Sequence, residues 1–89
     1  MRVMPLHSAA AGGSAEIVRQ LVEAGFPVNA TQHGGFTPLH AAAQNGDVEM
    51  TRLLLERGAD AGAKTEDGSS AIELARRGGF THVERLLGG

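Results

Sequence analysis

The sequence repeats itself at a fixed spacing of 33 residues. When residues 4–31 are aligned with residues 37–64, 12 of the 28 positions are identical and no gap is needed. A further shift of the same length aligns Gly46 with Gly79 near the end of the chain. Self-similarity at such a period is typical of repeat proteins, in which one unit is too small to bury its own apolar face. The predicted units of this single domain are residues 2–34, 35–67 and 68–89.

The middle unit carries the signals that begin and end two short helices. The Thr37 hydroxyl can accept a hydrogen bond from a free amide of the first turn, and Pro38 suits the first helical position. Gly46 ends this helix at little cost because glycine readily adopts a positive φ. Asp47 can then cap a second helix, whose apolar residues over 48–55 form one wide face. We therefore expect two short helices in each unit, followed by a polar turn that contains glycine.

The composition excludes several classes of protein. The 89 residues include no cysteine, so a disulfide framework and a thiolate metal site are ruled out, which favours a cytoplasmic location with a nuclear one as the alternative. The formal net charge of −2 provides no basic field for a phosphate backbone. No apolar segment approaches the roughly 20 residues of a membrane span. We expect neither nucleic acid nor a membrane as partner.

The histidines and serines do not form a pattern that predicts catalysis. His7 and His40 are 33 residues apart and so occupy equivalent positions, and no histidine pair has the i, i+4 spacing of a helical zinc site. Ser8 follows His7 directly, and adjacent residues on a helix point apart. The sequence has no G-x-S-x-G motif and no Walker-type loop. We expect no enzyme activity, no metal and no cofactor.

Two segments of the middle unit resemble an ankyrin repeat. They are Gly-Phe-Thr-Pro-Leu-His-Ala-Ala-Ala at residues 35–43 and Leu-Leu-Glu-Arg-Gly-Ala-Asp at residues 54–60. The first unit keeps Pro-Leu-His at 5–7, whereas the third has Ser-Ala-Ile-Glu at 70–73. The resemblance implies an all-α solenoid of stacked antiparallel helix pairs with β-hairpin-like fingers. It also implies a non-catalytic scaffold, in which the repeated histidine orients neighbouring loops through hydrogen bonds.

The resemblance further implies where a protein partner binds, namely at the fingertips and on the concave surface of the first helices. Phe36 is the candidate for an aromatic anchor, and the alternative is that its ring packs against its own finger. If it is an anchor, Phe36→Ala weakens partner binding without unfolding the protein. The implied contact residues are His33, Phe36, Gln44, Asn45, Lys64, Glu66, Asp67, Ser69 and Arg77.

The last unit carries charges that suit the exposed end of a stack. Arg76 stands where the middle unit has Ala43, and Glu84 stands where it has Thr51. Such charges, together with Glu73 in place of a histidine, predict a polar cap that keeps the end of the stack soluble. Phe80 stands where a polar residue is usual in the resembling family, and it either fills a gap at this end or is exposed for contact.

The first unit is rich in alanine and has no charged shield, since Gln20 is its one polar replacement. Three explanations stay open for this apolar end: Arg2 and the first residues cover it, the array was cut from a longer one, or a second copy binds it to form a homodimer. The corresponding alternative function is that of a regulatory or self-assembly segment of a larger protein, such as an enzyme or a channel.

Overall fold

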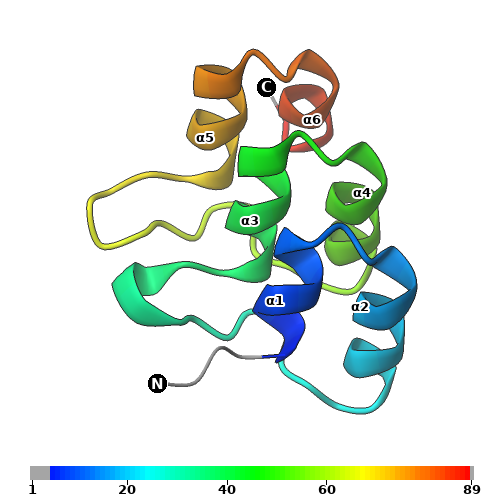
Figure 1. Ribbon diagram of the computed structural model, residues 1–89. Helices are drawn as coiled ribbons and strands as arrows, with labels where there is room; N and C mark the ends of the chain where they lie inside the picture. The colour runs from blue at the N-terminus through cyan, green and yellow to red at the C-terminus, as the bar shows by residue number, and fades with distance from the viewer. Residues whose placement is uncertain (1–4, 89) are drawn as a thin grey trace.

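The computed structural model describes residues 5–88, which form six α-helices arranged as three antiparallel pairs (Figure 1). Arg2 lies outside the described residues. The first helices of the pairs form one layer, the second helices form another, and the pairs follow one another from the blue end to the red end of the stack. The all-α architecture expected from the sequence is confirmed. The helices are α1 (Pro5–Ala11), α2 (Ala15–Glu23), α3 (Pro38–Asn45), α4 (Val48–Glu56), α5 (Ala71–Gly78) and α6 (Thr81–Leu86).

The helix ends of the middle unit are capped as the sequence predicts. The Thr37 hydroxyl accepts a hydrogen bond from the His40 backbone amide at 3.3 Å, and Pro38 occupies the first position of α3. Gly46 ends α3 with a φ of +68°. The Asp47 carboxylate accepts from the Met50 amide at 3.1 Å and so begins α4. These local signals fix where each short helix starts and stops.

The core runs along the stack at the joints between the pairs. Helix α3 packs between α1 and α5, and α4 packs between α2 and α6. At these joints Ala42, Ala43 and Leu54 are fully buried. Small side chains on the first helices allow the backbones of neighbouring pairs to approach closely, which explains a core with so few aromatic rings.

Two finger-like loops project from the layer of first helices, at the left in Figure 1. The first finger precedes α3 and holds a single turn of 3₁₀-helix, η1 (His33–Gly35), closed by a β-bridge between Gln32 and Phe36. The second precedes α5 and is closed by a β-bridge between Lys64 and Ser70. Within residues 5–88 the fingers are thus single-bridge turns, too short to form strands.

Phe80 fills a gap at the joint between the middle and last units. Its ring lies so close to Gly46 and Gly78 that a Cβ atom on either residue would come within 2.4 Å of a ring carbon. The middle unit has Asn45 and Asp47 at the positions of Gly78 and Phe80. The last unit therefore replaces two polar side chains with one ring and the space that the ring requires. The packing role left open by the sequence is therefore present. The ring is half-buried and also lines a small hollow, so the contact role stays a prediction.

The charged residues of the last unit divide into two roles. Arg76 Nε donates to a Glu84 carboxylate oxygen at 3.0 Å on the outer side of the stack, as a polar cap requires. Glu73 does something different, because its carboxylate accepts from the Ser70 amide at 2.8 Å at the start of α5. Glu73 completes the capping box of its own helix, as His40 does in α3, and its contribution to the end cap stays a prediction.

Candidate functional site

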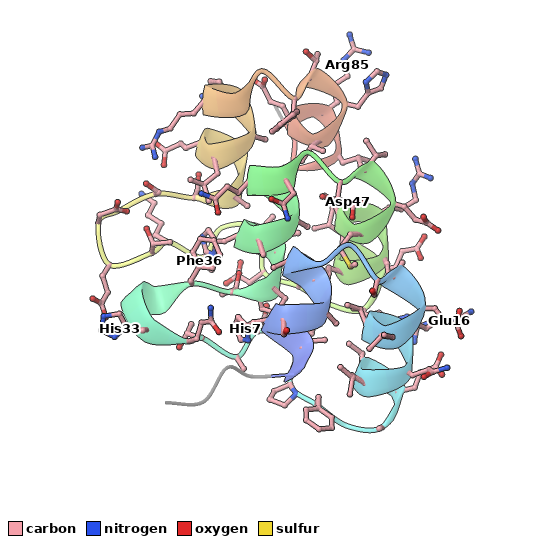
Figure 2. All side chains as sticks on the ribbon, viewed as in Figure 1. His7, Glu16, His33, Phe36, Asp47 and Arg85 are labelled. Carbon is pink, nitrogen blue, oxygen red and sulfur yellow. The ribbon has the colours of Figure 1, made fainter. Side chains whose placement is uncertain are left out.

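A groove of about 510 Å³ lies between the two fingers and the adjacent surfaces of α3 and α5. Phe36 and Leu74 are the larger apolar side chains of this groove, and Gln44 and Arg77 lie on the helix side. Figure 2 shows His33 on the first finger and Phe36 further in, towards the helices. Seven of the nine predicted contact residues line it, namely His33, Phe36, Gln44, Glu66, Asp67, Ser69 and Arg77.

The two fingers are joined by a backbone hydrogen bond. The Glu66 amide donates to the Gly34 carbonyl oxygen at 2.8 Å. Gly35 makes this approach possible, because a Cβ atom there would lie 3.2 Å from the Glu66 nitrogen and its φ is +75°. A side chain at Gly35 would therefore strain the backbone and crowd the second finger. The groove wall is built from two segments that are held together before any partner arrives.

The repeated histidines tie each first helix to the finger that follows it. His7 Nε2 donates to the Phe36 carbonyl oxygen at 2.9 Å, and His40 Nε2 donates to the Ser69 carbonyl oxygen at 3.2 Å. His40 Nδ1 accepts from the Thr37 amide at 3.1 Å, so the ring holds one proton and is neutral. Burial lowers the pKa of both histidines below 6.5, and the carbonyl contacts only partly oppose this. The loop-orienting role implied for them by the resemblance matches these contacts.

The Phe36 ring packs within the protein and also lines the groove. It is half-buried and stacks on the His40 ring, with the ring centroids 5.5 Å apart and the planes inclined by 29°. Its backbone carbonyl holds His7. The packing role left open by the sequence is therefore present, and the anchor role stays a prediction. A substitution at Phe36 would change both the groove and the support of His40.

The charged side chains around the groove differ in the hydrogen bonds and ion pairs that they form within the protein. Asp67 accepts hydrogen bonds from the Thr65 hydroxyl and the Ser69 amide, and these bonds lower the pKa of its carboxyl group, with a smaller contribution from Arg77. Within the described part of the chain, Glu66 and Arg77 form no ion pair. The Arg77 guanidinium and the Glu66 carboxylate are therefore exposed and in no ion pair, whereas the Asp67 carboxylate is already engaged by hydrogen bonds.

Three of the predicted contact residues are placed less favourably. Ser69 is only 3% exposed, and its backbone groups serve the finger turn and His40. The Asn45 amide donates to the Ala11 carbonyl oxygen at 2.9 Å, so it satisfies the free end of α1. Lys64 is exposed but belongs to the bridge of the second finger and does not line the groove. Direct contact with a partner stays untested for all three.

Gly34, which the resemblance also implies as part of the first finger's contact surface, lines the groove as well, and sequence reasoning missed the remaining three residues, namely Gln32, Thr65 and Leu74. Leu74 had a usable signal, because it lies three residues before Arg77 and residues at this spacing share one face of a helix. It also stands where the middle unit has the small residue Ala41. A side chain larger than its repeat equivalent on a predicted contact face indicates a local change in surface shape.

A second hollow, of about 820 Å³, lies on the other side of the stack between α2 and α4. Charged side chains of both helices surround it, and Ile17 and Leu53 are its large apolar members. Arg57 pairs across the joint with Glu23 at 3.2 Å. This hollow is wide and largely surrounded by charges. It contains Arg57, which the resemblance implies as a lesser contact candidate, but none of the nine contact residues given above.

The described helices alone define the class of protein, which is a solenoid of stacked helix pairs with projecting loops. A family model described as "Ankyrin repeats (3 copies)" matches residues 2–65. The chain belongs to the ankyrin repeat family. The match ends before α5, where Ser70 to Glu73 depart from the Thr-Pro-Leu-His motif. None of the curated proteins compared with the chain matches it.

Ankyrin repeats are generally modules for protein–protein interaction, and the family is typically non-catalytic. Residues 5–88 contain no group of three or more histidine, cysteine or acidic side chains that could hold a metal ion. None of the helices described above is both long and apolar enough to span a membrane.

Proposed function

We propose that this chain is a non-catalytic module that binds a protein partner in the groove between its two fingers. The observation that carries the proposal is the arrangement around Arg77. This guanidinium is exposed, forms no ion pair within residues 5–88, and lies beside the half-buried rim of Phe36 and Leu74. Arginine and aromatic side chains around an apolar centre are typical of residues that dominate binding energy.

The joined fingers support the same proposal. Because the Glu66 amide is already bonded to Gly34, and His40 to Ser69, the groove walls are ordered in the free protein. A preformed surface loses little conformational entropy on binding, which leaves more of the contact energy for affinity. The unpaired Glu66 carboxylate and the Arg77 guanidinium would select a partner with charges of both signs.

The test uses the whole chain as bait for proteins from its native source, identified by mass spectrometry. Arg77→Glu is expected to lose the specific partner, because it reverses the one unpaired cation of the groove. Arg85→Glu is the matched control, since it makes the same charge change on α6, far from the groove (Figure 2). A partner retained by Arg77→Glu as well as by Arg85→Glu would contradict a contact in the groove.

A further inference from the structure

Equivalent positions in the three units differ sharply in exposure. Ile17, Met50 and Val83 occupy the same position of the repeat. Met50 and Val83 are fully buried, whereas Ile17 is 49% exposed. The same holds for the first helices, where Ala42 and Ala75 are fully buried and their equivalent in α1, Ala9, is only half-buried.

The last unit shows which neighbour covers these positions. Within residues 5–88 the last pair has a preceding pair but no following one, yet Val83 and Ala75 are fully buried. The cover must therefore come from the preceding pair. The first pair has no such neighbour in the described part of the chain. Its surface formed by Ala9, Ile17 and Gln20 is here called the leading face, and Ile17 also borders the hollow between α2 and α4. Ile17 and Phe26, the large apolar residues that are exposed within residues 5–88, both lie in this first unit.

The opposite end of the stack cannot cover the leading face of a second copy. Positions that contact a following pair are apolar and fully buried in the first unit, at Ala10 and Val18. In the last unit the same positions are Arg76 and Glu84, which form an ion pair. Head-to-tail addition of copies would bury this pair, and burying an ion pair carries a large desolvation penalty.

The leading face can, however, pack against the leading face of a second copy without bringing like charges together at the centre. A two-fold interface brings each residue of the face close to its own copy, so a charged residue at the centre would meet a like charge. Ala9 and Ile17 carry no charge. The Gln20 Nε2 donates to a Glu16 carboxylate oxygen at 3.2 Å, which leaves its second proton and its oxygen for another amide. The nearest charges, Glu16 and Arg19, already form an ion pair with each other.

We propose that the leading face binds the leading face of a second copy and forms a closed two-fold dimer. The dimer buries Ile17 as Met50 and Val83 are buried within one chain, so it continues the joint that the stack already uses. The α6 ends, each with its Arg76–Glu84 ion pair, point outward in this dimer. The groove between the fingers lies on α3 and α5 and stays free, so the dimer presents two grooves to a partner.

The first test measures the mass of the whole chain in solution by sedimentation equilibrium over a wide range of concentration. The expected result is a mass of two chains that falls to one on dilution. Ile17→Glu is expected to weaken this association by more than about 100-fold, because two carboxylates would meet in an apolar interface. Thr81→Glu is the matched control, since it adds the same charge at an exposed position of α6. Circular dichroism confirms that both variants keep their helices.

The second test reads the geometry of the dimer. Because the chain has no cysteine, Ile17→Cys introduces one thiol that a short bis-maleimide can join to its copy. We expect cross-linked dimers from Ile17→Cys and none from Thr81→Cys. A single-chain mass at every concentration, a dimer that survives Ile17→Glu, or cross-linking through Thr81→Cys alone would each overturn the proposal. None of these outcomes depends on the groove.

Discussion

The two ends of the stack differ in the side chains at positions that are buried in its interior: the α6 end has charged residues there, and the α1 end has apolar ones. At the α6 end, Arg76 and Glu84 form an ion pair at positions where the units before them are apolar or small. At the α1 end, Ile17 keeps the apolar character of Met50 although nothing in residues 5–88 covers it to the same extent. Each end consists of one antiparallel helix pair, α1 with α2 and α5 with α6, and the contrast in charge and exposure comes from a few side chains. Those side chains suit the α6 end to solvent and leave apolar surface exposed at the α1 end.

The largest effect on the free energy of unfolding is expected when an interior leucine is compared with its equivalent in the first unit. Leu54 and Leu21 occupy equivalent positions, and Leu54 is fully buried whereas Leu21 is half-buried. Leu54→Ala should lower the free energy of unfolding by about 2–5 kcal/mol, because it leaves a cavity at a joint. Leu21→Ala should cost clearly less. Urea unfolding followed by circular dichroism measures both, and equal losses would show that the first unit is covered as fully as the second.

A second comparison concerns the joint that Phe80 fills. Gly46→Ala adds a Cβ atom 2.4 Å from the Phe80 ring at a φ of +68°, so both strain and overlap oppose it. We expect a loss of about 2 kcal/mol or more in the free energy of unfolding. Gly79→Ala has a similar φ of +75° but no atom within 4 Å of the new Cβ, so it measures strain alone. If the two variants unfold at the same urea concentration, the ring does not occupy the position described.

Acid should weaken the interior joints before it affects the last unit. Burial lowers the pKa of His7 and His40 below 6.5, so the unfolded chain binds more protons than the folded one when the pH falls below that value. Their contribution to stability is complete above pH 6.5 and is lost progressively below it. In α5 the equivalent residue is Glu73, whose pKa is lowered from 4.5 by its bonds with Ser70. Its contribution is therefore lost only at a lower pH, below 4.5.

Urea midpoints measured between pH 5 and pH 7.5 test this expectation. The midpoint should rise with pH in the wild-type protein. The slope should be reduced in His40→Gln, which removes one of the titrating rings. A wild-type midpoint that falls as the pH rises through this range would contradict the sign.

The smallest effect on the free energy of unfolding is expected at the α6 end, which carries the Arg76–Glu84 ion pair. Arg76 and Glu84 lie at the surface, with 59% and 27% of their side chains exposed, and exposed ion pairs contribute about 0–1 kcal/mol. A double-mutant cycle with Arg76→Ala and Glu84→Ala isolates this coupling energy, which high salt should reduce further. A coupling well above 1 kcal/mol would indicate that this end is more enclosed than the exposure suggests.

Much of the fold was predictable because it depends on local signals that recur. Thr37, Gly46 and Asp47 act on their own neighbours, so their roles could be inferred from one unit and confirmed in the structure. The role of Glu73 could have been inferred in the same way, because a serine followed three residues later by a glutamate is the sequence signature of a capping box. It was missed because the comparison with the histidine of the middle unit drew attention only to the change in charge, and the structure shows the carboxylate accepting from the Ser70 amide.

The groove was predictable in outline because position in the repeat determines which side chains face the fingers. Its detail was not, because it depends on contacts between units. Asn45 bonds to Ala11 across 34 positions of sequence, and the carbonyl oxygen of the buried Ser69 accepts from the histidine of the preceding unit. Leu74 was missed because an apolar residue on a helix is more often part of the core.

The hydrogen bond between Glu66 and Gly34 has a consequence for how binding energies add. It lies far out on the fingers, yet the Glu66 amide should exchange slowly with solvent because releasing it requires the two fingers to separate. In the proposed complex, contacts made by His33 on the first finger and by Glu66 on the second would then not be independent. A substitution on one finger should change the energetic effect of a substitution on the other, so the two loops would act as a single thermodynamic unit in that complex.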